Sequence, residues 1–254
     1  MIDLHSHLLP GVDDGSKTVE QSVGVLREMS RLGVTDVCLT PHLLASRASK
    51  GVPPAQDGAF AALRAAAPPE IQLHRGAEVM LDRPLSSDIA AARRITLGGT
   101  RYLLVEFPRL VTAQTVYQAL TLLTETGLVP LVAHPERYAC CAPETVHRWK
   151  ETGALMQVDA TTLVSGRSRG ERARQLVSHG LADVAAADNH GDGRSLAAGH
   201  QVLADHGGTR QAELLMTENP RAILDDRPAE SVPPVSFRTS IVQRIRWLFD
   251  GEDS

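Results

Sequence analysis

Seven short apolar segments alternate along this chain with amphipathic ones, and this alternation limits the folds that are open to it. Each apolar segment has the length and composition of a strand buried in a sheet. Strands that alternate with helices pair in parallel, through right-handed crossovers. The expected strands cover residues 2–7, 34–40, 71–79, 102–107, 129–133, 154–158 and 182–187.

The intervening segments carry apolar residues at three- and four-residue steps, which is typical of amphipathic helices. We expect a loop over residues 44–54, a Pro-rich linker over 225–236 and a closing helix over 238–249. The domains would then be a main unit at 1–225 and a tail at 226–254. The other expected helices cover residues 18–31, 55–67, 86–94, 114–126, 143–152, 170–179, 196–206 and 211–216, with a last short one from residue 218.

Polar side chains follow nearly all the expected strands, and their number favours a barrel over an open sheet. A barrel brings all its strand ends to one mouth, whereas an open doubly wound sheet gathers only those near a switch point. We therefore expect an α/β fold with a distorted (β/α)7 TIM-like barrel, followed by a short C-terminal helical tail.

The first strand ends in two histidines that face the same way. Side chains repeat every two residues along a strand, so His5 and His7 point to one side. A Pro-Gly turn and the acidic pair Asp13-Asp14 follow. Two imidazoles beside carboxylates make half of a metal site.

The later strand ends supply the other half, and all the donors are nitrogen or oxygen. One ion cannot use so many ligands, so we expect two or three divalent ions with bridging carboxylates. Buried carboxylates in such number would be too costly without cations. Mixed imidazole and carboxylate ligands suit Mn, Fe or Zn, and the lack of thiolates argues against a structural zinc. The candidate metal ligands are His5, His7, Asp14, His42, Glu78, Glu106, His134, Asp188 and His190.

Composition excludes several other classes of protein. The formal net charge is −4 and no basic run flanks the motifs, so affinity for nucleic acid is not expected. The three cysteines, Cys38, Cys140 and Cys141, lack Cys-x-x-Cys spacing, which favours a reducing compartment. No signal peptide and no apolar run near the ~20 residues of a membrane span is seen. We expect a cytoplasmic protein without a transmembrane segment.

The sequence resembles the PHP (polymerase and histidinol phosphatase) superfamily, and within it the CpsB/YwqE-type bacterial protein-tyrosine phosphatases of capsule and exopolysaccharide synthesis. The matching motifs follow the family order over residues 1–224. The chain departs from many relatives at Leu43, where they have a second His or a polar residue. The motifs are DLHSHLLPGVDDGS at the start, T-P-H at 40–42, G-A-E at 76–78, V-E-F-P at 105–108, A-H-P-E-R at 133–137, D-N-H at 188–190 and E-N-P at 218–220.

The resemblance implies a PHP barrel whose nine ligands, the residues named above, hold three metal ions, often manganese. Arg137 would be the catalytic residue that holds the phosphate oxygens, since its planar fork matches phosphate. A metal-activated water would hydrolyse phosphotyrosine on a protein, by resemblance the tail of a bacterial tyrosine kinase that controls polysaccharide export. The alternative is a PHP-type phosphoesterase acting on a small molecule such as histidinol phosphate.

Two other classes are disfavoured, and the role of the tail stays open. Many amidohydrolases bridge two metals with a carboxylated Lys on the fourth strand, but Lys17, Lys50 and Lys150 lie on no expected strand, and Glu106 ends the fourth. A binding module with a decayed site does not fit a complete donor set. The tail helix could pack on the barrel or on a neighbouring subunit of a homo-oligomer, or dock to a kinase or a membrane surface.

Overall fold

The computed structural model describes residues 1–48, 50–85 and 95–237 of the chain. All the strand pairs in this part of the chain are parallel, as the alternation predicts. The strands are β1 (Ile2–Ser6), β2 (Asp36–Leu39), β3 (His42–Leu44), β4 (Gln72–Arg75), β5 (Glu78–Met80), β6 (Tyr102–Glu106), β7 (Val129–Ala133), β8 (Leu155–Asp159) and β9 (Val184–Ala186).

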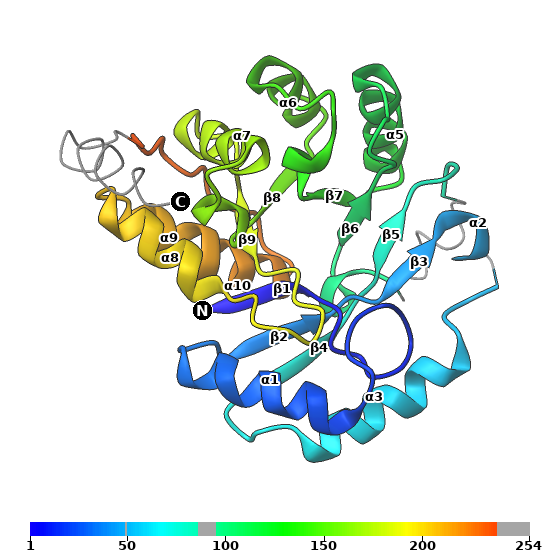
Figure 1. The fold of residues 1–254 in the computed structure, drawn as a ribbon. Coiled ribbons are helices and arrows are strands. Elements are labelled where there is room, and N and C mark those ends of the chain that lie inside the picture. The colour runs from blue at the N-terminus through cyan, green and yellow to red at the C-terminus, as the bar shows by residue number, and fades with distance from the viewer. Residues whose placement is uncertain (49, 86–94, 238–254) are drawn as a thin grey trace, which may run out of the picture.

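Helices surround the strands (Figure 1), with α1 and α3 below them in this view and α5, α6 and α7 above. Short 3₁₀ turns at Leu97–Gly99, Pro135–Arg137 and Thr162–Val164 were not foreseen, nor was the π-helical turn at Leu214–Glu218. The described helices are α1 (Val19–Arg31), α2 (Ala45–Ala48), α3 (Pro54–Ala66), α5 (Ala113–Glu125), α6 (Pro143–Lys150), α7 (Ser168–Ser178), α8 (Leu196–Asp205), α9 (Thr209–Glu213) and α10 (Asn219–Leu224).

The strand expected over 34–40 forms as β2, but a further strand, β3, was not foreseen; it begins after Pro41, which has no N–H to give to a ladder. The prediction of a continuous strand over 71–79 was wrong, because this strand breaks at Gly76, between β4 and β5. The register is the same before and after the breaks, because Leu39 pairs with Arg75 and His42 with Glu78. The two breaks therefore carry His42 and Glu78 together from one sheet to the next.

The breaks divide the strands into a three-stranded sheet, β1-β2-β4, and a six-stranded sheet, β3-β5-β6-β7-β8-β9. A single bridge between Ser6 and Asn189 joins the end of β1 to the segment after β9, and the His7 N–H donates to the Asn189 carbonyl at 2.7 Å. The fold is thus α/β with parallel sheets, while the closed seven-stranded barrel stays a prediction.

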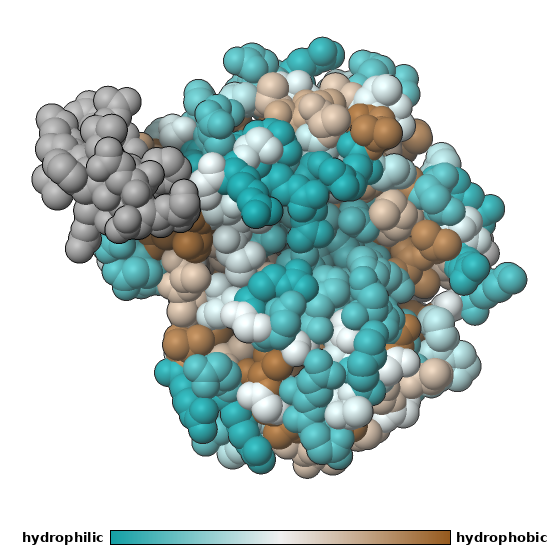
Figure 2. Space-filling view, in the orientation of Figure 1, coloured by the Kyte–Doolittle hydropathy of each residue, from teal (hydrophilic) through white to brown (hydrophobic). Residues whose placement is uncertain are grey.

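Alternation along the strands explains how the core leads to a polar mouth. On β6, Tyr102 and Leu104 belong to a small buried cluster that also takes Leu131 from β7 and Val184 from β9. Glu106 is next in the β6 row, two residues beyond Leu104, so it stands at the end of this apolar column. Figure 2 shows hydrophilic side chains gathered around the hollow in the middle of this face. The fold thus places its polar groups where the apolar core ends.

Four other predicted segments differ from the structure or lie outside its described part. The expected loop over 44–54 was wrong in part, since α2 forms at Ala45–Ala48. The expected helices at 86–94 and 238–249 lie outside the described residues. The expected linker lies against the body, because Val232 and Val235 are buried in the main core. Within the described ranges, no helix has both the length and the apolar character needed to cross a membrane.

One buried carboxylate ties β2 to two other elements. Asp36 accepts hydrogen bonds from His74 on β4 at 2.9 Å, from the Thr35 hydroxyl at 2.8 Å and from Arg221 on α10 at 2.5 Å. Burial alone would raise the pKa of Asp36, but these hydrogen bonds hold it below its usual value.

We predict that Asp36→Asn lowers stability by about 1–3 kcal/mol near pH 7, because charge-assisted bonds are lost. The pKa of Asp36 is depressed in the folded state, so its contribution is full above about pH 4 and fades as the pH falls further. Thermal unfolding of both proteins at pH 7 and near pH 3.5 should show the gap in Tm closing. The exposed Glu70→Gln serves as control, and a pH-independent gap would contradict this account.

Candidate metal centre

The structure brings all nine predicted ligand residues to one place, at the ends of the strands. They form four overlapping groups in which one donor atom from each member lies within 4.8 Å of the others. Four residues, His5, His7, His42 and Glu78, each belong to two groups, so neighbouring groups share ligands. The groups are His7, Asp14, His42 and His190; His5, Glu78 and His134; His5, His7 and Asp188; and His42, Glu78 and Glu106.

Neighbouring residues fix which ring nitrogen of His5 and of His7 carries the hydrogen. Nδ1 of His5 lies 2.9 Å from Oε1 of Gln157, an oxygen that can only accept, since the Gln157 amide nitrogen donates to the Val158 carbonyl. Nδ1 of His7 lies 2.8 Å from a carboxylate oxygen of Asp13. Both Nδ1 atoms therefore carry hydrogen, and in the neutral rings both Nε2 atoms present lone pairs.

These lone pairs converge with two carboxylate oxygens. His5 Nε2 and His7 Nε2 are 3.2 Å apart, and each lies 3.3–3.4 Å from Oδ1 of Asp188 and from Oε2 of Glu78. Neither oxygen has a hydrogen-bond partner among the described residues. The two Nε2 atoms and Oδ1 of Asp188 form a triangle with sides of 3.2–3.4 Å. The centre of such a triangle lies about 2 Å from each atom, which is the usual metal–ligand distance. The donors therefore fit a cation.

Without a cation, only protons can relieve this crowding. Burial disfavours the charged form of His5, yet the carboxylates of Glu78 and Asp188 raise its pKa to about 9. Burial raises the pKa of Glu106 to about 7, and the neighbouring Glu78 carboxylate adds to the rise. Protons and divalent ions would thus compete for the same lone pairs.

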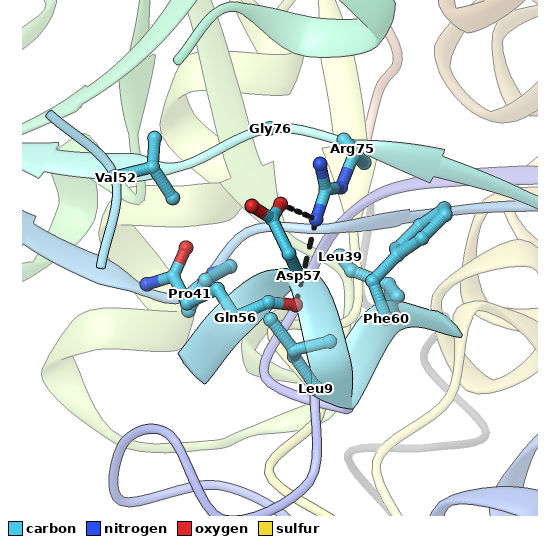
Figure 3. A pocket seen from close by; sticks show the side chains of 9 residues that line it. All are labelled: Leu9, Leu39, Pro41, Val52, Gln56, Asp57, Phe60, Arg75 and Gly76. Atoms are coloured by element: carbon cyan, nitrogen blue, oxygen red, sulfur yellow. Dashed lines mark hydrogen bonds and ion pairs between the residues drawn. The ribbon is translucent and has the colours of Figure 1, made fainter. Parts of the chain in front are cut away.

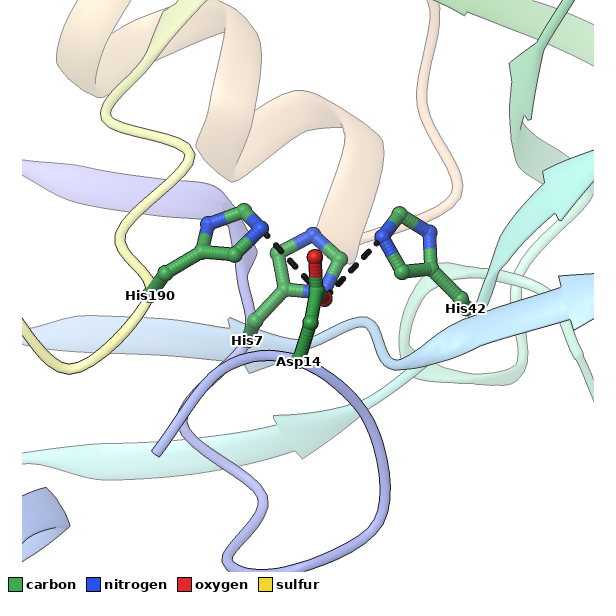
Figure 4. Close-up of side chains that lie close together, drawn as sticks. All are labelled: His7, Asp14, His42 and His190. Carbon is green, nitrogen blue, oxygen red and sulfur yellow. Dashed lines mark ion pairs between the residues drawn. The ribbon is translucent and has the colours of Figure 1, made fainter. Parts of the chain in front are cut away.

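The outer part of the cluster is more open to solvent. Figure 4 shows Asp14, from the loop after β1, reaching between His42 and His190, with His7 beside them. Oδ1 of Asp14 lies 3.3 Å from Nε2 of His42 and 3.6 Å from Nε2 of His190. The Asp14 side chain is 67% exposed, so this group faces the entrance.

Unusual backbone conformations aim two of the donors. His134 and Asp188 have φ values of 32° and 48°, in the left-handed region that costs a side-chain-bearing residue energy. Gly15 closes the loop after β1 so tightly that a Cβ there would meet the His7 carbonyl oxygen at 2.0 Å. The chain thus accepts local strain to bring these loops onto the cluster.

Two arginines reach the cluster from the side away from the histidines. Arg137 pairs with Oδ2 of Asp188 and lies 3.4 Å from Asp159, while Arg194 lies 3.4 Å from the same Asp188 oxygen. Oδ1 of Asp188 faces His5 and His7 instead. Burial alone would lower the pKa of Arg137, but the charges of Asp188 and Asp159 raise it by more. The pKa therefore lies above its usual value, and the guanidinium stays charged.

A separate pocket lies between α3 and the ends of β2 and β4 (Figure 3). Its volume is about 220 Å³, and Arg75 pairs with Asp57 across it and covers the Phe60 ring. Pro41 and Gly76, from the two strand breaks, also line it. None of the nine candidate ligands lines this pocket, so the metal chemistry belongs to the strand ends.

Several residues of the site were not predicted from the sequence. Asp13 was noted only as part of an acidic pair, and Gln157 and Arg194 not at all. Asp3 is fully buried, and its Oδ1 accepts from the backbone N–H groups of His5 and Ala187, at 3.2 Å each. Burial raises the pKa of Asp3 to about 7. The only sequence signal for Asp3 and Gln157 was a polar residue inside an apolar strand.

Fold and site together define a class of protein: a parallel α/β chain whose strand ends gather imidazoles and carboxylates in a cluster that fits several divalent ions. The family model described as capsular polysaccharide synthesis, CpsB/CapC, matches residues 1–225. The chain belongs to this family, as the sequence motifs predicted.

Named relatives agree with this family. The chain is 28% identical over 244 residues to the tyrosine-protein phosphatase CpsB of Streptococcus pneumoniae, covering 89% of this chain and 99% of that one. It is 29% identical over 197 residues to the tyrosine-protein phosphatase YwqE of Bacillus subtilis, covering 75% and 77%. A solved structure from work on YwqE and CpsB, described as unique metal-dependent tyrosine phosphatases, matches with a TM-score of 0.78 and 25% identity, over 94% of this chain and 100% of that one.

We predict that Gln157→Leu weakens divalent metal binding about 10- to 100-fold, because His5 loses the acceptor that fixes its tautomer. Titration of the chelator-treated protein with Mn²⁺, followed by calorimetry, would measure the change. Gln201→Leu on α8, which lies on an exposed face, is the matched control. Unchanged affinity in a folded Gln157→Leu protein would contradict the role given to this amide.

Proposed function

We propose that this chain is a metal-dependent protein-tyrosine-phosphate phosphatase. The observation that carries the proposal is the convergence of two imidazole lone pairs and two buried carboxylate oxygens beside a charged arginine. The CpsB and YwqE relatives, which are named tyrosine-protein phosphatases, point to the same reaction. The proposal extends to a distorted barrel formed by the two sheets, with residues 1–225 as the catalytic domain.

The nine clustered residues would hold two or three divalent ions, and we propose manganese, with iron or zinc as alternatives. Four of the ligands are carboxylates, which is enough negative charge to neutralise two divalent ions. Bound ions would lower the pKa of water and offset the charge of the phosphate group.

The chain's own residues position the phosphate. Arg137 carries a planar fork of donors and stays charged, so it suits the non-bridging oxygens of a phosphate group. Arg194 lies close enough to the same Asp188 oxygen to assist it. A tyrosine phenolate has a pKa near ~10, far below that of an alkanol, so it needs little help from a general acid to leave.

We propose that the physiological substrate is a phosphotyrosine segment of a bacterial tyrosine kinase involved in capsule or exopolysaccharide synthesis. The family description supports a role in capsule synthesis. Leu43, next to His42, is buried here, so this position offers no polar contact to a substrate.

A direct comparison of substrates tests the proposed reaction. We predict that the Mn²⁺-loaded protein hydrolyses a phosphotyrosine peptide at least tenfold faster, in kcat/KM, than the matched phosphoserine peptide or histidinol phosphate, because phenolate is the better leaving group. Chelation should abolish the activity and added Mn²⁺ restore it. A preference for histidinol phosphate would instead assign the chain to the small-molecule phosphoesterases.

We further predict that Arg137→Ala lowers kcat about 10²–10³-fold without loss of bound metal. The metal should stay because Arg137 contacts Oδ2 of Asp188, whereas the oxygen that faces the histidines, and would bind the metal, is Oδ1. Metal analysis and phosphatase assays on the same sample separate the two effects. Arg27→Gln, an exposed change on α1, is the control, and metal loss from Arg137→Ala would refute its assignment to phosphate.

A further inference from the structure

A group of arginines lies at the mouth on the side of Arg137. Arg109 follows β6, and its carbonyl accepts a hydrogen bond from the Ala139 N–H at 3.1 Å, just past the turn that holds Arg137. Arg169 and Arg172 stand in the first turns of α7, and Nε of Arg172 donates to the Glu136 carbonyl at 2.8 Å. We call Arg109, Arg169 and Arg172 the arginine rim.

The arginine rim lacks acidic partners. Within the described ranges, no carboxylate lies within 4.0 Å of a guanidinium of Arg109, Arg169 or Arg172, although the protein as a whole carries a net charge of −4. Arg194, which also lies near the cluster, differs because it pairs with Asp192 at 2.8 Å. The rim is therefore a local concentration of uncompensated positive charge.

The rim arginines lie close enough to repel one another. Burial lowers the pKa of Arg169, and the charges of Arg109, Arg137 and Arg172 lower it further. Glu136 opposes this effect, but its Oε1 accepts hydrogen bonds from the Asp159 N–H at 2.8 Å and the Thr162 hydroxyl at 3.0 Å, so it does not pair with a rim guanidinium. An anion placed among these side chains would relieve the repulsion and gain several charge-assisted contacts.

We propose that the arginine rim binds a second anionic group on the same peptide that presents its phosphotyrosine to Arg137. This inference rests on the proposed function and narrows its substrate class to peptides with a phosphate or carboxylate beside the target tyrosine. Arg137 joins the two sites, since it touches Asp188 in the cluster and contributes to the charge at Arg169. The rim residues act in binding, and no step of the reaction is assigned to them.

The test uses three peptides that differ at one position near the phosphotyrosine, which carries alanine, glutamate or a second phosphotyrosine. We expect the Arg109→Gln/Arg169→Gln double variant to lose about tenfold in kcat/KM on the two anionic peptides, mostly through KM. Activity on the alanine peptide and on phenyl phosphate should stay within twofold of the unmodified protein. The difference should shrink as salt rises, because exposed charges are screened.

Two controls keep the outcomes distinct. Arg27→Gln on α1 removes an exposed positive charge away from the rim and should affect all peptides equally. Binding of non-hydrolysable phosphonate versions of the three peptides, measured by fluorescence anisotropy, tests the rim even if no peptide is hydrolysed. Loss on the diphosphorylated peptide alone assigns the rim to phosphate, and loss on both anionic peptides assigns it to either anion. If the double variant binds each of the three peptides as tightly as the unmodified protein does, the proposal is overturned.

Discussion

The site depends on lone pairs that point at one another. Gln157 and Asp13 hold the hydrogens of His5 and His7 on the outer nitrogens, which leaves two inner nitrogens facing two carboxylate oxygens. Such an arrangement is repulsive unless positive charge enters it. The fold therefore holds mutually repelling donor atoms together at its strand ends, and the proposed metal ions would offset this repulsion.

Breaks between strands place two of these donor residues in the cluster. Strands that ran without a break from β2 into β3 and from β4 into β5 would have stayed in one sheet. The breaks at Pro41 and Gly76 occur in step, so His42 and Glu78 stay paired while they move into the other sheet. Glu78 then lies at the junction of the two sheets, where His5, His42 and His134 all reach it. One carboxylate thus links donors from β1, from β3 and from the residue that follows β7.

Much of this could be predicted because side-chain alternation is a property of the chain itself. The parallel α/β order follows from apolar periodicity, and the nine candidate ligands follow from polar residues at the strand ends. The end of the second strand before Pro41 was predicted, but the break at Gly76 and the strand β3 were not, since both depend on pairing between distant parts of the chain. Gln157 could not be recognised either, because an isolated amide in a strand gives no pattern. Its role depends on a partner 152 residues away.

The pairing of Arg137 with Asp188 has a consequence for what happens after hydrolysis. Arg137 pairs with Asp188 through one terminal nitrogen, while its Nε has no hydrogen-bond partner among the described residues, so an incoming anion would be bound with this carboxylate still beside it as a competitor. Free phosphate formed in the site would meet the same competition. Asp188 is thus a second anion fixed beside Arg137, and it opposes the binding of any negatively charged group there, whether it belongs to a substrate or to a product.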